Sequence, residues 1–164
     1  MATLARLIED GSILRWDVLL PPRCQPERTL LLLPQLPARM TQALEVGSTW
    51  NIEESPAQQI DALSVIFVAG EPLVFGRQFK SLVHHQHGVW YFKTADVRLF
   101  GWFPHRDCFI AAAVGGADLT KRLNLYRPFA EEVGRLRGAL QLDEPKFVAK
   151  EDPSAVVSNY SFVP

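Results

Sequence analysis

Hydrophobic and polar positions follow two rhythms along the chain, one with a period of two residues and one with a period of three to four. Alternation over residues 13–20 predicts a strand with one apolar face, which two prolines end because proline cannot donate to a strand ladder. The loop beyond it has room for a short strand over residues 30–33. The chain therefore begins with a β element.

Helical spacing of apolar residues marks three later segments. Residues 37–46 start with a proline suited to a first helical turn and are followed by Gly47. Ser55 and Gln58 form a capping box that opens a second helix, which ends near Gly70. The closeness of these two helices predicts a helical hairpin. A third helix is expected over residues 125–140.

Three short segments between the second and third helices are rich in aromatic and β-branched residues. They cover residues 89–94, 97–103 and 108–114, and turn-forming residues separate them. Strands joined by such short links pair with their sequence neighbours in opposite directions. The segments therefore predict an antiparallel meander.

The order of these elements predicts an α+β fold. We expect an antiparallel sheet, made of the meander and the N-terminal strand, with the helical hairpin and the C-terminal helix packed on it. A single domain is expected over residues 1–142. Residues 143–164 carry three prolines among polar residues and predict an extended tail, with residues 156–157 and 160–162 as docking points.

Composition excludes several classes of protein. The 164 residues are 48% hydrophobic and 21% charged, which is a globular balance. No apolar run approaches the ~20 residues that span a bilayer, and the N-terminus lacks the apolar core of an export signal. Cys24 and Cys108 are far apart and suit reduced thiols better than a disulfide. We therefore expect a cytoplasmic protein without a membrane partner.

Charge and histidine are concentrated in the centre of the chain. Residues 77–137 hold 10 Lys/Arg, 5 acids and all four histidines, which favours an anionic partner if these residues share a surface. His85 and His87 have the spacing of two metal ligands. A stable zinc site takes three or four, however, and no further residue stands at a metal-binding spacing. We expect a solvated loop and neither metal nor cofactor.

Basic residues alternate with aromatic ones in and after the meander. Lys93 ends the first strand and Arg98 begins the second, while Lys121 and Arg122 follow the third. Across a tight meander these cations can gather at one end of the sheet. Cations suit phosphates and flat rings suit unstacked bases, so the pattern favours RNA. The alternative, that the rings form core and the cations are solvated, stays open. Nucleotide-binding glycine loops and the HExxH and GxSxG motifs are absent.

Over about residues 55–140 this layout resembles the RelE/HigB-type toxins of bacterial toxin–antitoxin pairs, which have the RelE/ParE fold. The resemblance rests on Val89-Trp90-Tyr91-Phe92-Lys93 in the first meander strand, on Val97-Arg98-Leu99-Phe100 in the second, and on Lys121-Arg122 after the third. It implies metal-independent endonucleolytic cleavage of mRNA, often on the ribosome, and an antitoxin protein as partner.

The resemblance also implies roles for individual residues. Arg98 would stabilise the pentacovalent phosphorane, and Lys93, Lys121 and Arg122 would bind phosphate or assist proton transfer. RNA contacts are expected from a further set: His84, His85, His87, Trp90 and Tyr126. A second hypothesis is a non-catalytic protein-interaction module on the same fold, either an inhibitor of a partner enzyme or a phage- or mobile-element-borne accessory protein.

Overall fold

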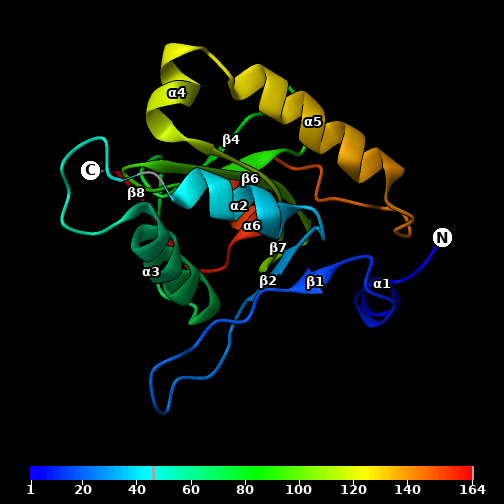
Figure 1. The fold of residues 1–164 in the computed structure, drawn as a ribbon. Helices are drawn as coiled ribbons and strands as arrows, with labels where there is room; N and C mark the ends of the chain where they lie inside the picture. Colours follow the sequence, from blue (N-terminus) through cyan, green and yellow to red (C-terminus); the bar gives the residue numbers. More distant parts are fainter. Residues whose placement is uncertain (46, 164) are drawn as a thin grey trace.

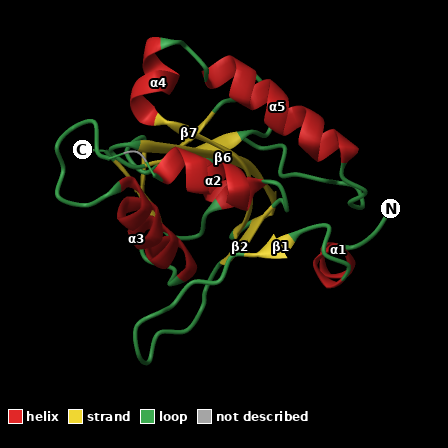
Figure 2. Cartoon of the chain, viewed as in Figure 1, coloured by secondary structure: helices red, strands yellow, loops and turns green. Residues whose placement is uncertain are grey.

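One mixed sheet of eight strands runs through the part of the chain that the computed structural model describes, residues 1–45 and 47–163. Helices lie on both faces of this sheet, with α4 and α5 above it and α3 below it in Figures 1 and 2. The strands are β1 (Leu14–Arg15), β2 (Thr29–Leu32), β3 (Leu73–Phe75), β4 (Phe79–Ser81), β5 (Trp90–Lys93), β6 (Val97–His105), β7 (Cys108–Gly116) and β8 (Tyr160–Phe162). Their order across the sheet is β1-β2-β7-β6-β5-β4-β3-β8.

The expected purely antiparallel sheet is wrong, although the meander at its centre is confirmed. β5, β6 and β7 are consecutive antiparallel strands. β2, however, pairs with β7 in parallel, and β8 pairs with β3 in parallel. Parallel neighbours need a long crossover, and here α2, α3 and the strands β3–β6 lie between β2 and β7 in the chain. Local alternation of side chains predicts a strand but carries no information about such distant partners.

The N-terminal strand also differs from its prediction. Only Leu14–Arg15 of residues 13–20 pairs as β1, at the sheet edge, whereas Thr29–Leu32 forms β2 inside the sheet. Leu30, Leu31 and Leu32 are all buried, as is typical of a parallel strand that is covered on both faces. The short strand expected over residues 30–33 is confirmed as β2, shifted by one residue, but its place inside the sheet could not be predicted from alternation because the run has no polar face.

The three predicted helices are confirmed. They are α2 (Leu36–Leu44), α3 (Pro56–Val68), whose capping box is present, and α5 (Tyr126–Ala139). The predicted last residue of the first helix, Val46, lies outside the described residues. The sequence did not predict α1 (Leu4–Glu9), α4 (Ala117–Arg122) or α6 (Pro153–Val156). No described helix has the length and apolarity that crossing a membrane requires.

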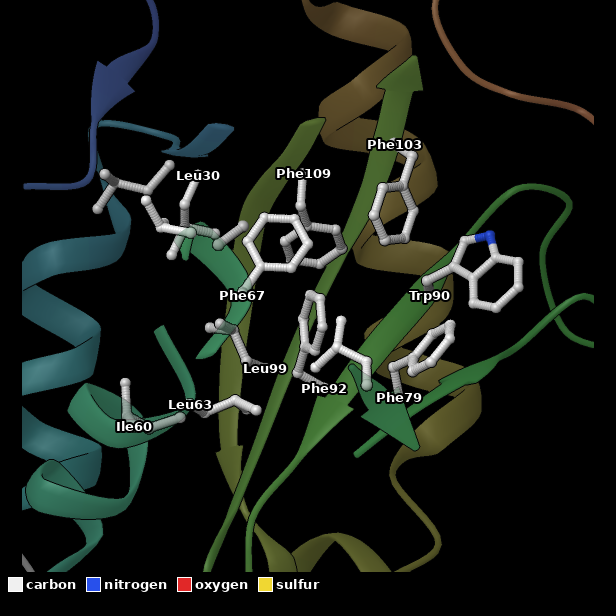
Figure 3. Close-up of a cluster of buried hydrophobic side chains, with 14 of the residues drawn as sticks. Leu30, Ile60, Leu63, Phe67, Phe79, Trp90, Phe92, Leu99, Phe103 and Phe109 are labelled. Atoms are coloured by element: carbon white, nitrogen blue, oxygen red, sulfur yellow. The ribbon is translucent and has the colours of Figure 1, made fainter. Parts of the chain in front are cut away.

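The sheet lies between two hydrophobic cores. On one face α2 and α3 cover a cluster of aromatic side chains from β4–β7, which Figure 3 shows with Phe67 of α3 among them. On the other face α1 and α5 cover a second cluster around Phe100 and Trp102. Alternate side chains of β5 and β6 point to opposite cores, so the position of a residue in the strand decides whether its side chain meets α5.

Residues 143–163 belong to this architecture. Val156 and Val157 are fully buried in the α3-side core, and β8 extends the sheet beyond β3. Val148 donates its N–H to the carbonyl of Phe103 at 2.9 Å. The expected docking points therefore make contact, but as a packed segment with a short helix and an edge strand. Pro164, the last residue of the predicted tail, lies outside the described residues.

Candidate functional site

Four cations gather at one end of the sheet, on the face that α5 covers, and we call them the basic cluster: Lys80, Lys93, Arg98 and Lys121. Lys93 and Arg98 lie directly opposite each other on β5 and β6. Burial lowers the pKa of Lys93, and the charges of Arg98, Lys80 and Lys121 lower it further. The structure thus brings together three of the residues that the sequence pointed to, Lys93, Arg98 and Lys121.

Arg98 is held rigidly inside the cluster. Its side chain is only 2% exposed. Nη1 donates to the carbonyl oxygens of Thr94 at 2.6 Å and Val97 at 3.0 Å, and Nε donates to the Tyr126 hydroxyl at 3.3 Å. Two of its three nitrogens are therefore engaged within the protein. Arg98 supplies a fixed positive charge more than a free fork for an incoming phosphate.

Lys93 is the more accessible neighbour. It is half-buried at the end of β5, and Nζ donates to the Gly76 carbonyl oxygen at 3.2 Å. Burial, and then three nearby cations, disfavour the protonated form of this amine and lower its pKa below the ordinary value for lysine. A lysine with a lowered pKa can accept a proton closer to neutral pH than an ordinary lysine.

Two tyrosines border the cations. The rings of Tyr91 and Tyr126 lie 5.4 Å apart between centroids, and Tyr126 contacts Arg98. Burial, and then the proximity of Tyr126, raise the pKa of Tyr91 to about 12, so this phenol keeps its proton at neutral pH. Sequence reasoning found Tyr126 but missed Tyr91 and Lys80. Tyr91 of β5 and Lys80 of β4 could have been found from strand alternation, which directs both side chains to the face that α5 covers. Lys80 was missed because β4 was not predicted as a strand.

The histidines divide into two places. His84 and His85 have ring centroids 4.0 Å apart, beside the first half of α5. Partial burial, then the charges of His84 and Arg127, lower the pKa of His85. His87 instead contacts the C-terminal segment, with Nε2 2.9 Å from the Ala149 carbonyl oxygen. Within residues 1–45 and 47–163, no group of three or more metal-ligating side chains comes together.

Two predicted site residues lie elsewhere. The Trp90 indole is 1% exposed in the aromatic core on the opposite face, stacked on Phe79, so it cannot stack on an RNA base (Figure 3). Arg122 pairs with Asp118 at 3.2 Å and lines a separate cavity of about 530 Å³ between α2 and α4. The physical reason is geometric, since strand alternation turns Trp90 away from Lys93 and the helical rotation of α4 turns Arg122 away from Lys121.

Comparison of the chain with protein-family models, with curated proteins and with solved structures gives no match. The chemistry of the site is therefore argued from its own geometry. The basic cluster offers fixed positive charge and one lysine with a lowered pKa, and the phenols of Tyr91 and Tyr126 lie beside it. This combination suits binding of a phosphodiester and transfer of a proton to and from it.

Proposed function

We propose that this protein is a metal-independent endoribonuclease of the RelE/HigB-like toxin class. The observation that carries the proposal is the pair of opposed cations, Lys93 and Arg98, with Lys121 and the hydroxyl of Tyr126 beside it. The antiparallel β5–β7 meander is also a feature that the resemblance implies, although β3 and β4 come between α3 and β5.

The cluster supports a reaction in which the RNA attacks its own backbone. The neutral amine of Lys93 takes the proton of a ribose 2′-hydroxyl, and the 2′-oxygen forms a bond to the adjacent phosphorus. The bond from phosphorus to the 5′-oxygen then breaks, and that oxygen takes a proton from the Tyr126 hydroxyl. The products are a 2′,3′-cyclic phosphate and a free 5′-hydroxyl. Lys121, which is exposed, binds a non-bridging phosphate oxygen.

Arg98 takes a different part from the one the resemblance implied. Since its guanidinium is buried and engaged with Thr94 and Val97, it acts mainly through its field. That field lowers the pKa of Lys93, and the Nε–H holds the Tyr126 hydroxyl in place. Arg98 is therefore a positioning residue, and Lys93 is the proposed catalytic base.

The setting of this activity follows from the class. The substrate is single-stranded mRNA in the cytoplasm, at the ribosome or free, and the inhibitory partner is an antitoxin protein. Lys80 together with His84 and His85 lies on the same side of the sheet as Lys93 and extends the surface available to the RNA backbone. His87 lies further along, on the C-terminal segment.

Cleavage of a labelled single-stranded RNA tests the proposal. The purified chain should produce fragments that end in a 2′,3′-cyclic phosphate, and Lys93→Ala should lower the rate by roughly 100-fold, as loss of a general base does. Lys150→Ala is the matched control, because Lys150 is exposed and lies outside the cluster. A Lys93→Ala variant that cleaves as fast as the parent would remove the basis of the mechanism.

One observation favours the second candidate, a protein-interaction module. Leu119 and Leu123 stand one helical turn apart and are 49% and 59% exposed. Such a pair suits an apolar contact with a protein partner. Salt distinguishes the candidates, because RNA affinity that depends on several cations falls steeply with ionic strength, whereas affinity through an apolar interface does not.

A further inference from the structure

A cavity of about 220 Å³ lies between α3 and the turn that joins β5 to β6. Its lining is partly aliphatic, and its polar rim comes from α3, from β5 and from the segments beside them. The lining residues are Ile52, Glu54, Gln59, Ala62, Leu63, Ile66, Gln78, Lys93, Thr94 and Ala95. A flat, partly apolar ring with polar edges matches this kind of lining.

This cavity adjoins the basic cluster. Lys93 belongs to both, and Thr94 connects them, because its carbonyl oxygen accepts from Arg98 at 2.6 Å while its hydroxyl donates to Gln59 at 2.8 Å. Gln59 also accepts from the Asp96 N–H at 2.9 Å, which fixes α3 against the turn. The walls are therefore held together by partly or fully buried hydrogen bonds. Because β5 ends at Lys93, a nucleotide whose phosphate lies at the Lys93 amine places its base in this cavity by passing around that end of the sheet to the α3 side.

Two polar groups on the rim have unused hydrogen-bonding capacity. The Glu54 carboxylate has no hydrogen-bond or ion-pair partner among the described residues. Gln78 uses its Oε1 to accept from the Val74 N–H at 2.7 Å, which directs its Nε2 donor away from that contact. The rim thus combines a charged acceptor with an amide donor.

We propose that this cavity binds a guanine base of the RNA. Guanine presents two adjacent donors, N1–H and the N2 amino group, that a carboxylate such as Glu54 accepts together. Its O6 accepts from an amide donor such as Gln78. Adenine and cytosine place an amino donor where guanine places O6, and uracil lacks the second donor for the carboxylate. This inference rests on the proposed function, because it takes the RNA phosphate to lie at Lys93.

Binding of four RNA hexamers tests the inference. Each is fully 2′-O-methylated, so that no 2′-oxygen can attack, and each carries G, A, C or U at its third position in an otherwise all-uridine sequence. The dissociation constant of each is measured by fluorescence anisotropy. We expect the G-containing hexamer to bind about 10-fold or more tightly than the other three.

Two variants and one matched control assign the preference to the cavity. Glu54→Gln should reduce the ratio of G to U affinity to about 1, because uracil lacks only the second donor for the carboxylate. Gln78→Glu keeps the acceptor for Val74 and should reduce the ratio of G to A affinity to about 1, because adenine carries an amino group where guanine carries O6. Glu53→Gln, an exposed neighbour that does not line the cavity, should leave the ratio unchanged.

The possible failures are distinct. Four equal, strongly salt-dependent affinities would overturn the guanine site and leave the basic cluster as an RNA surface. An unaltered G preference in both variants would also overturn it. Absence of binding to all four hexamers would overturn the RNA assignment of the cluster itself, and the guanine site with it.

Discussion

Lys93 and Arg98 occupy directly opposed positions on the antiparallel strands β5 and β6, so two cations face each other on one side of the sheet. Like charges in this arrangement destabilise a strand pair. Arg98 offsets part of that cost with hydrogen bonds to Thr94, Val97 and Tyr126. Burial, and then the repulsion that remains between Lys93 and the neighbouring cations, lower the pKa of Lys93.

Removing the charge of Arg98 should raise the pKa of Lys93. We expect Arg98→Met to move the Lys93 titration, followed by NMR of the lysine side chains, upward toward the ordinary value of about 10.4. Because only the neutral amine acts as a base, the rising limb of the cleavage rate against pH should shift to higher pH by the same amount.

Arg106→Met is the control for this titration, since Arg106 is exposed in the β6–β7 turn. Arg98→Lys keeps the charge and should retain most of the depression of the Lys93 pKa. An unchanged Lys93 titration in Arg98→Met would mean that the charge of Arg98 does not influence the pKa of Lys93, and would remove Arg98 from the mechanism.

The C-terminal segment should contribute to stability as part of the core. Val156 is fully buried against the α3-side cluster. Val156→Ala removes two methyl groups from this packing and should lower the free energy of unfolding by about 2 kcal/mol. Urea denaturation measures the change. Val163→Ala, at a position 46% exposed, should change it by less than about 0.5 kcal/mol.

Arg28 should hold this segment to the rest of the fold. Its guanidinium donates to the carbonyl oxygens of Phe67, Glu71 and Asn159, each at 3.0 Å, and Nε lies 3.4 Å from Asp107. Arg28→Met leaves these acceptors without a donor and should cost about 3 kcal/mol or more.

Hydrogen exchange provides the local measurement for Arg28. Amides of residues 156–162 should lose protection in Arg28→Met before those of the β5–β7 meander do. Arg77→Met, at an exposed site, is the control. Uniform loss of protection across the chain would mean that Arg28 stabilises the whole domain and not this segment in particular.

Gly101 should be indispensable for the pairing of β6 with β7. A Cβ at this position would lie 2.0 Å from the Ile110 carbonyl oxygen and 2.7 Å from the Phe109 ring. Gly101→Ala must therefore displace backbone, and we expect it to lower the unfolding free energy by more than about 3 kcal/mol. Gly116→Ala in the same hairpin meets no atom within 4 Å and should be nearly neutral. Thermal unfolding of the two variants distinguishes them.

Local signals in the sequence determined the elements whose causes are themselves local. The capping box of Ser55 and Gln58 starts α3, and the short links between the aromatic segments leave β5, β6 and β7 no partners nearer than one another. The side-chain spacing of residues 125–140 likewise sufficed for α5. In each case the information lies within a few residues of the element that it specifies.

Only the tertiary structure decided which strands become parallel neighbours and which cations meet. The parallel pairing of β2 with β7 joins residues about 80 positions apart, and no local pattern encodes it. Trp90 and Lys93 are three residues apart in one strand, yet strand alternation buries the first in one core and brings the second to Arg98 on the other face. Lys121 and Arg122 are adjacent in sequence, but helical rotation separates them. The sequence showed that cations and aromatic residues occur together in this region. Which of them meet in the site depends on the direction in which each side chain leaves its strand or helix, and the assembled sheet fixes that direction.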